Sequence, residues 1–328
     1  MEVVKNIQNL QDRISAVITV GNFDGVHQGH RAIIDPLVAE AKRLNVKSVL
    51  MTFAPSSKEF FAKEKDIKLI TTIDEKQKLF SDLGIDILII QKFDSEFSKL
   101  SSNDFIEQIL LKKIDVKECI LGSTHTFGNN NNGNFKSLNE LGKKHNFDIK
   151  VVDIVKKNGY NTSSTNLRTL LATGEIDNAN KILGREYSIR GQVISGKQIG
   201  RNLGFPTVNL KPISAKKLIP KVGVYCVEIS DENNRYNGMC NIGYNPTFNG
   251  NRLSIEINII NREFQSIGND EIELKFYSRI RDEEKFKNEE ELIEQLKRDK
   301  ENCEKYFINK KNQISRYSEK RRLNDNIN

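Results

Sequence analysis

The pattern of apolar residues changes near the middle of this 328-residue chain, and this change limits the folds open to it. Up to about residue 153, short β-rich runs alternate with segments of helical periodicity, which predicts βαβ units and a parallel, doubly wound sheet. The clearest helix follows the first run and carries apolar residues on one face. These residues are Ile33, Ile34, Leu37, Val38 and Ala41, and the predicted strands cover residues 16–20, 48–53, 86–90, 118–121 and 149–153.

From about Tyr187 onward the chain reads as strand after strand, which predicts a compact antiparallel barrel or sandwich. A last helix, with Asn288 as its N-cap and running to about Phe307, should pack on that barrel, and the polar, basic residues 310–328 are expected to fray. Residues 154–186 hold a turn and two short helices, and a boundary near Leu183 predicts domains 1–183 and 184–328. The predicted later strands cover residues 187–194, 223–229, 236–242, 253–260 and 271–276.

The composition indicates a soluble cytoplasmic protein. No run approaches the roughly 18 apolar residues of a membrane span, and the amino terminus lacks the features of a signal peptide. The four cysteines have no CxxC spacing, so we interpret them as reduced thiols that form neither disulfides nor a zinc site. The net charge of +7 suits polyanionic ligands, and it fits nucleotides as readily as nucleic acid.

The segment VGNFDGVHQGH (20–30) joins the first predicted strand to the first predicted helix. Glycines there permit a tight turn and close approach of the backbone to a phosphate, while the helix offers unpaired N–H groups. The spacing is not GxGxxG, so it disfavours a dinucleotide site. His27 and His30 can donate to phosphoryl oxygens. The alternative is a glycine-rich turn with two solvated histidines.

GxFDGxHxGH, from Gly21 to His30, resembles the adenylyltransferase signature of the bacterial bifunctional riboflavin kinase/FAD synthetase family, within the HxGH nucleotidyltransferases. TFAP (52–55), LITTIDEKQKLFSDLGID (69–86), ILGSTHTFG (120–128) and SSTNLR (163–168) follow in the family's order. The resemblance implies a Rossmann-like N-terminal domain in which His27 and His30 stabilise charge at the α-phosphate of ATP while the FMN phosphate attacks it. It also implies nucleotide contacts from Gly21, Phe23, Asp24, Gly29, Ser163, Ser164, Thr165 and Arg168.

The SSTNLR segment suits phosphate binding, since hydroxyl groups open a helix and an arginine follows one turn later. As local structure alone, it is a good N-cap. Two segments depart from the family pattern. Ser56 and Ser57 stand where the family usually has HP after a proline, and Thr124 and His125 stand where it has Asp or Asn followed by Phe.

GRNLGFPTVNL (200–210) resembles the family's riboflavin kinase signature. Thr207 and Asn209 lie two apart, so an extended segment presents both on one face, where their oxygens could bind Mg²⁺. The alternative is an edge strand that begins at a proline. The resemblance implies that Glu256 is the catalytic base, which takes the proton from the 5′-hydroxyl of riboflavin, although Glu256 is also typical of an outward-facing strand residue. Gly200, Arg201 and Arg281 are further predicted nucleotide contacts.

Residues 191–197 fit the start of a Walker A motif, but Gln198 replaces its Ser/Thr and no helix follows, so we reject a P-loop and expect a phosphate-facing loop at 196–201. The resemblance therefore implies a C-terminal β-barrel riboflavin kinase domain that makes FMN from riboflavin and ATP. The N-terminal domain would convert FMN and ATP to FAD and pyrophosphate. Both steps should need Mg²⁺.

Two alternatives stay open. The first is a riboflavin kinase alone, with an inactive or altered N-terminal domain. The second is a basic binding protein that binds nucleic acid or responds to flavin, which would need a basic face with interleaved aromatic residues. Only the short tail from Lys310 to Arg322 is basic in this way, so we expect no nucleic-acid partner and no membrane. The sequence leaves the oligomeric state open.

Overall fold

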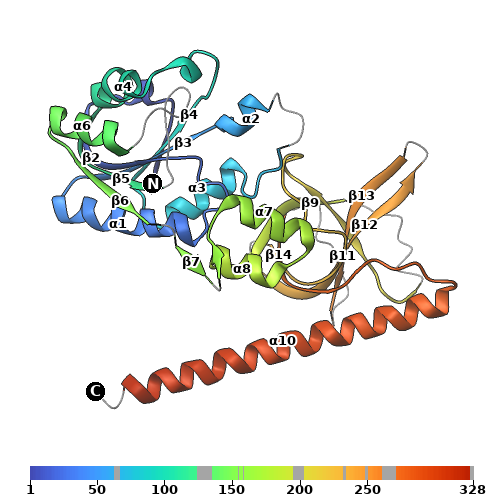
Figure 1. Cartoon of the computed structure of the whole chain (residues 1–328). Coiled ribbons are helices and arrows are strands. Elements are labelled where there is room, and N and C mark those ends of the chain that lie inside the picture. Colours follow the sequence, from blue (N-terminus) through green and yellow to red (C-terminus); the bar gives the residue numbers. More distant parts are fainter. Residues whose placement is uncertain are drawn as a thin grey trace. The chain divides into compact units, whose positions relative to one another are not determined.

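A computed structural model describes residues 1–62, 67–123, 135–153, 155–157, 159–194, 203–231, 234–247, 250–260 and 271–325 (Figure 1). The chain forms two compact units. The first contains Met1–Arg168 and Ile182–Gly184, and the second contains Thr169–Lys181 and Arg185–Asn328. The single boundary near Leu183 stays a prediction, because the chain passes between the units more than once.

The first unit contains a six-stranded sheet in the order β1-β4-β3-β2-β5-β6, and every neighbouring pair is parallel. The doubly wound sheet predicted from the alternating pattern is thus confirmed. The short edge strand β1 was not predicted. The strands are β1 (Glu2–Lys5), β2 (Ile14–Val20), β3 (Lys47–Phe53), β4 (Ile87–Gln91), β5 (Ile114–Gly122) and β6 (Asp148–Val152).

The strand order reverses direction at β2. From β2 the chain moves through β3 to β4 on one side, and it then returns to place β5 and β6 on the other. Ligands of such sheets bind outside the carboxyl ends of the strands at this switch point. The segment VGNFDGVHQGH leaves the sheet there, since β2 ends at Val20.

Both faces of the sheet are covered. Alternate strand residues point to opposite faces, so Val17 packs with Leu37 of α1 on one face, while Ile18 packs with Phe105 on the other. The helices of this unit are α1 (Gln28–Leu44), α2 (Ser57–Phe61), α3 (Ile73–Asp82), α4 (Ser102–Asp104), α5 (Leu111–Lys113) and α6 (Phe135–His145), with 3-10 turns η1 (Ile7–Asn9) and η2 (Phe97–Lys99) and the π-helix η3 (Phe105–Leu110).

The predicted turn and two short helices of residues 154–186 are confirmed. A hairpin of β7 (Lys156–Lys157) and β8 (Tyr160–Asn161) leads into α7 (Ser164–Thr173) and α8 (Ile176–Leu183).

The second unit contains a closed antiparallel barrel in the order β10-β13-β12-β11-β14-β9, which confirms the barrel and excludes the sandwich. Because β10 pairs with both β13 and β9, it is not an edge strand. The interior is apolar; Leu210, Val227, Ile255 and Ile257 are all buried. The strands are β9 (Tyr187–Ile194), β10 (Val208–Pro212), β11 (Gly223–Ser230), β12 (Arg235–Thr247), β13 (Gly250–Ile259) and β14 (Glu271–Arg281).

The C-terminal helix α10 (Glu289–Asp325) packs on the outside of the barrel, as predicted. Asn288 is its N-cap, since the Asn288 side-chain oxygen accepts from the Glu291 N–H at 2.9 Å. The prediction that residues 310–328 fray was wrong for residues 310–325, because the helix continues to Asp325 (Figure 1). Lys310 extends the packing beyond Phe307: its ammonium lies 2.7 Å from the Glu186 carboxylate and 3.6 Å from the centre of the Tyr277 ring.

None of the described helices has both the length and the apolar character that a membrane span needs. All four cysteines are buried free thiols, as expected from their spacing.

Candidate active sites

The loop after β2 carries backbone donors that find no acceptor among the described residues. Phe23 and Val26 have positive φ angles of 47° and 41°, and Gly25 has one of 93°. Within the described part of the chain, no group accepts a hydrogen bond from the backbone N–H of Asn22, Phe23 or Asp24. Consecutive N–H groups around left-handed residues form a concave site for an anion.

The two histidines of this segment lie together at the start of α1. His27 is the N-cap, and its Nδ1 lies 3.3 Å from the His30 backbone nitrogen, which donates to it. The two imidazole rings stack with their centroids 3.6 Å apart, and the Phe23 and His30 rings meet edge to face with their centroids 5.1 Å apart. Only 4% of His27 is exposed, while His30 is half-buried and stacks on it, so the alternative of two solvated histidines does not hold for His27.

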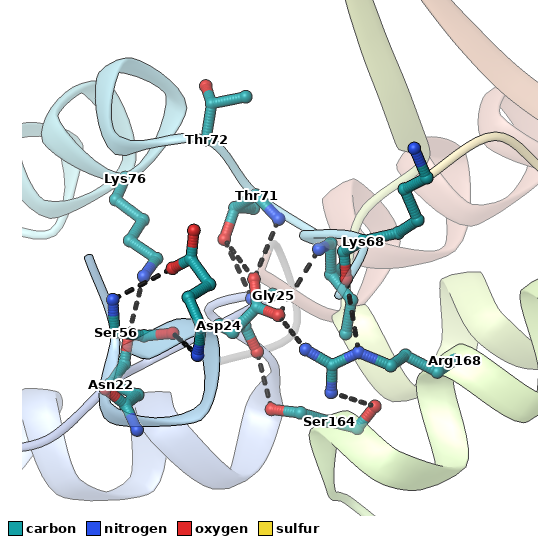
Figure 2. A network of polar contacts seen from close by, with 12 residues as sticks. Asn22, Asp24, Gly25, Ser56, Lys68, Thr71, Thr72, Lys76, Ser164 and Arg168 are labelled. Atoms are coloured by element: carbon teal, nitrogen blue, oxygen red, sulfur yellow. Dashed lines mark hydrogen bonds and ion pairs between the residues drawn. The ribbon is translucent and has the colours of Figure 1, made fainter. Parts of the chain in front are cut away.

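Asp24 fixes the loop to the rest of the unit (Figure 2). Its carboxylate accepts from the Thr71 backbone N–H at 2.9 Å, from the Ile70 N–H at 3.3 Å and from the Arg168 guanidinium. Arg168 also donates to the Ser164 carbonyl at 3.3 Å. In this arrangement Asp24 and Arg168 neutralise each other, so their predicted contacts with a nucleotide stay predictions.

The second predicted phosphate segment lies directly against the first. The Ser164 hydroxyl donates to the Asp24 carbonyl at 2.7 Å, while the Ser163 hydroxyl caps α7 by accepting from the Asn166 N–H at 3.2 Å. A Cβ on Gly29 would lie 2.5 Å from the Thr162 hydroxyl oxygen. The backbone at Gly29 therefore lies close to Thr162, the residue just before Ser163. Thr165 is exposed.

A cavity of about 1110 Å³ opens beside these groups, bounded at the carboxyl ends of β2 and β5 by Gly21 and Gly122. One part is polar and contains His30 and Ser164. Another part is aromatic, where phenylalanine rings meet edge to face or tilted with centroids 5.5–5.8 Å apart. The aromatic lining residues are Phe53, Phe61, Phe93, Phe97 and Phe105.

Ser56 and Ser57, which depart from the family pattern, also line this cavity. Ser56 is the N-cap of α2 and forms a capping box with Glu59. The Ser57 hydroxyl oxygen lies 3.2 Å from the Asn22 side-chain nitrogen, which donates to it. These serines thus build local structure at the cavity wall. Thr124 and His125 lie outside the described residues.

In the barrel, strand register brings the predicted kinase residues together. Asn209 of β10 lies directly opposite Glu256 of β13, and Asn241 of β12 is the partner of Glu256 on its other side. Opposite residues in antiparallel strands share one face, and Ile255 and Ile257 occupy the interior face. Glu256 therefore lies on the outer face of the barrel between two asparagines.

The segment before β10 is also held in place. The Asn258 side-chain nitrogen donates to the Pro206 carbonyl at 2.8 Å, and Asn258 is buried. Thr207 lies one residue before the start of β10 and two before Asn209, and its place on the same face as Asn209 stays a prediction. Among the described residues, no three His, Cys, Asp or Glu side chains gather as a metal site. A hydroxyl and an amide oxygen beside a carboxylate still suit Mg²⁺, which prefers oxygen ligands and keeps phosphate oxygens and waters.

Arg281, predicted to contact a phosphate, forms an ion pair within the protein. Its guanidinium binds the buried Asp299 of α10 through two nitrogens, at 2.8–3.0 Å, and Gln295 donates to the same carboxylate at 2.9 Å. This ion pair joins β14 to α10, and a phosphate contact by Arg281 stays a prediction. Gly200, Arg201 and the expected loop at 196–201 lie outside the described residues.

Two family models match this chain: FAD synthetase over residues 9–166 and riboflavin kinase over residues 183–307. The chain belongs to the bifunctional riboflavin kinase/FMN adenylyltransferase family. A member from Buchnera aphidicola of Schizaphis graminum is 38% identical, over 94% of this chain and 99% of its own. Members from Escherichia coli K12 and Bacillus subtilis are 33% and 34% identical, over 94% and 91% of this chain and 98% and 95% of theirs.

One solved structure is similar over 92% of this chain and 98% of its own, with a TM-score of 0.83 and 28% identity; its title is "Crystal Structure of Macrolide-efflux Protein from Streptococcus pneumoniae". The two family models, by contrast, each name an enzyme activity. This family member is therefore an enzyme that phosphorylates riboflavin to FMN and adenylylates FMN to FAD, with ATP as co-substrate. The alternative of a kinase with an altered N-terminal domain receives no support, because both models match.

Proposed function

We propose that FMN adenylylation takes place in the cavity beside the loop 21–30. The unpaired N–H groups of Asn22, Phe23 and Asp24 and the stacked His27 and His30 are the observation that supports this site. They present hydrogen-bond donors where charge grows on the α-phosphate of ATP. The FMN phosphate that attacks is already ionised, so stabilisation of charge is the main task and no general base is needed.

The two parts of the cavity suit the two parts of FMN. The phenylalanine rings offer a flat apolar surface for an isoalloxazine ring, since aromatic groups prefer offset or edge-to-face contacts. The polar part, with His30 and Ser164, suits the phosphates. Ser163, Thr165 and Arg168 would act at its edge, with Arg168 exchanging Asp24 for a phosphate oxygen.

The kinase reaction would take place on the outer face of the barrel at Glu256. Glu256 accepts the proton of the riboflavin 5′-hydroxyl as that oxygen attacks the γ-phosphate of ATP. Thr207 and Asn209 would hold Mg²⁺, which supplies charge neutralisation for the transferred phosphate when it is bound. The register that sets Asn209 opposite Glu256 supports this assignment, because the metal ligand and the base must lie beside the same phosphate. Gly200, Arg201 and Arg281 are retained as proposed nucleotide contacts.

We also propose that the enzyme acts in the cytoplasm, since all four thiols are free, and that it has no nucleic-acid partner. The test of the two sites is a time course of the purified protein with riboflavin, ATP and Mg²⁺, with flavins separated by chromatography. FMN followed by FAD is expected.

The His27→Ala/His30→Ala variant should stop at FMN, and Asn209→Ala should make no FMN yet convert added FMN to FAD. Full adenylylation by the double histidine variant would contradict the proposed N-terminal site. FMN formation by Asn209→Ala at the normal rate would contradict the barrel site.

A further inference from the structure

One peptide group of the phosphate-facing loop is held by two donors. The Asn22 carbonyl accepts from the Lys76 ammonium of α3 at 2.7 Å (Figure 2). It also accepts from the Thr52 hydroxyl of β3 at 3.2 Å, so both of its lone pairs are occupied. The same peptide group carries the Phe23 N–H. In a trans peptide this N–H points away from the carbonyl oxygen. It is one of the three loop donors that find no acceptor among the described residues.

The backbone at this peptide needs support. Phe23 adopts a φ angle of 47°, in the left-handed region that costs roughly 1–2 kcal/mol for a residue with a Cβ. Such conformations persist only where the surroundings fix them. The two bonds to the Asn22 carbonyl, together with the Asp24 clamp on the next residue, provide this restraint.

Lys76 is an unusual choice of donor, because only 4% of it is exposed. In the described part of the chain no carboxylate lies within 4 Å of the Lys76 ammonium nitrogen. The hydrogen-bond partner of this charged group is instead the neutral carbonyl of Asn22. Burial lowers the pKa of Lys76, the Asp24 and Glu59 carboxylates oppose that change, and Arg168 adds to it. A buried charge is costly unless it is compensated. An anionic ligand in the cavity, which Lys76 also lines, would provide that compensation.

We propose that Lys76 is a positioning residue of the adenylyl-transfer site, which fixes and polarises the Asn22–Phe23 peptide so that the Phe23 N–H donates to a phosphate oxygen of the bound nucleotide. A cation on the carbonyl oxygen strengthens the N–H of the same peptide as a donor, because linked hydrogen bonds polarise one another. This inference rests on the function proposed for the cavity. Thr52 holds the same carbonyl without a charge, so charge is what distinguishes the contribution of Lys76.

The test compares Lys76→Met, Lys76→Gln and Lys76→Arg in the full chain. Adenylylation of supplied FMN is measured from about pH 6 to about pH 10. This range includes the ordinary pKa of histidine and ends just below the ordinary pKa of lysine. Riboflavin phosphorylation by the same samples serves as the internal control for folding, together with the melting temperature.

For Lys76→Met we expect kcat of adenylylation to fall about 10- to 100-fold with a smaller change in KM, because the strengthened N–H acts on charge that grows in the transition state. Lys76→Gln keeps a hydrogen-bond donor without the charge, so its kcat of adenylylation should lie between that of Lys76→Met and that of the natural enzyme. The natural enzyme should lose activity as the pH rises through the lowered pKa of Lys76. Lys76→Arg should keep its activity to higher pH, since a guanidinium stays charged.

The double histidine variant provides the reference. If it loses adenylylation while Lys76→Met keeps the normal rate and pH profile, the Lys76 proposal fails and the proposed site stands. If the double histidine variant remains active, the site itself is wrong. Equal loss of both activities with a lower melting temperature and an unchanged pH profile would also overturn the proposal, because it would mean that Lys76 only supports the fold.

Discussion

The two proposed sites of this enzyme are built from different parts of the polypeptide. The N-terminal site presents mainly backbone N–H groups and histidines from eleven consecutive residues, VGNFDGVHQGH, at the end of one strand. The barrel site presents side chains from three strands, and register alone brings Asn209, Glu256 and Asn241 side by side. A substitution that adds atoms should therefore impair the backbone site most, whereas a substitution that removes a side-chain group should impair the barrel site most.

The largest effect should come from Glu256→Gln, which keeps the shape of the side chain and removes the base. We expect FMN formation to fall about 10²- to 10⁴-fold, the usual contribution of general base catalysis. Conversion of supplied FMN to FAD should not change. Chromatography of flavins over time measures both steps.

Glu271→Gln is the matched control, since Glu271 is an exposed strand residue of the same barrel that pairs with Arg190. It should leave both rates within about twofold, as expected for a surface ion pair. FMN formation by Glu256→Gln at the rate of this control would show that the barrel site does not depend on the base.

Asp299→Ala tests whether Arg281 belongs to the site or to the fold of the barrel unit. Removal of one partner from a buried ion pair typically costs about 3–5 kcal/mol, and the Asp299 side chain is only 1% exposed. We therefore expect a large decrease in the free energy of unfolding of the second unit, measured by denaturant titration. Glu301→Ala, which removes an exposed pair with Lys305 on the same helix, should cost at most about 1 kcal/mol.

A stable Asp299→Ala variant with weakened ATP binding would reverse this interpretation. It would mean that Arg281 acts mainly on a phosphate, and that side chains of the barrel do more of the nucleotide binding than the structure indicates.

Gly29→Ala tests the N-terminal site from the opposite direction, because it adds one methyl group. That group would lie 2.5 Å from the Thr162 hydroxyl oxygen and 2.9 Å from the Thr162 carbonyl oxygen. Overpacking of this kind costs about 1–3 kcal/mol, and it should push the two phosphate segments apart. We expect adenylylation to fall about tenfold or more while riboflavin phosphorylation continues. Normal FAD formation by this variant would show that the close approach is not required.

Much of the fold could be predicted from local pattern. Strands β2 to β6 and helix α1 follow from alternating β-rich and helical segments. Two features needed more than local pattern. The short β1 has too few residues to show a period. The part of α10 beyond Phe307 is polar and basic, and the contacts of Lys310 with Glu186 and Tyr277 join residues far apart in the sequence, which local pattern does not show.

The sites divide in the same way. His27, His30 and Gly29 could be proposed from the sequence because their spacing is itself the motif. Asn241 was missed because only strand register places it beside Glu256. Lys76 was also missed, although a signal existed: it lies three residues after Ile73 and four before Phe80, on the face of α3 that an apolar pattern predicts to be buried. A lysine in such a position is a reason to look for a charged ligand nearby.

The smallest effect concerns the tail of α10. Lys310→Met keeps the apolar stem but removes the ion pair with Glu186 and the charge over the Tyr277 ring. Both groups of the ion pair are about one-third exposed, so the loss should be about 1 kcal/mol or less in the unfolding of the second unit. Neither reaction rate should change, because no residue assigned to either site contacts Lys310. Lys297→Met, at an exposed position of the same helix, should leave stability within about 0.5 kcal/mol. If Lys310→Met slowed FMN formation without a loss of stability, the tail would have to be counted with the barrel site, which would then extend beyond the residues that strand register brings together.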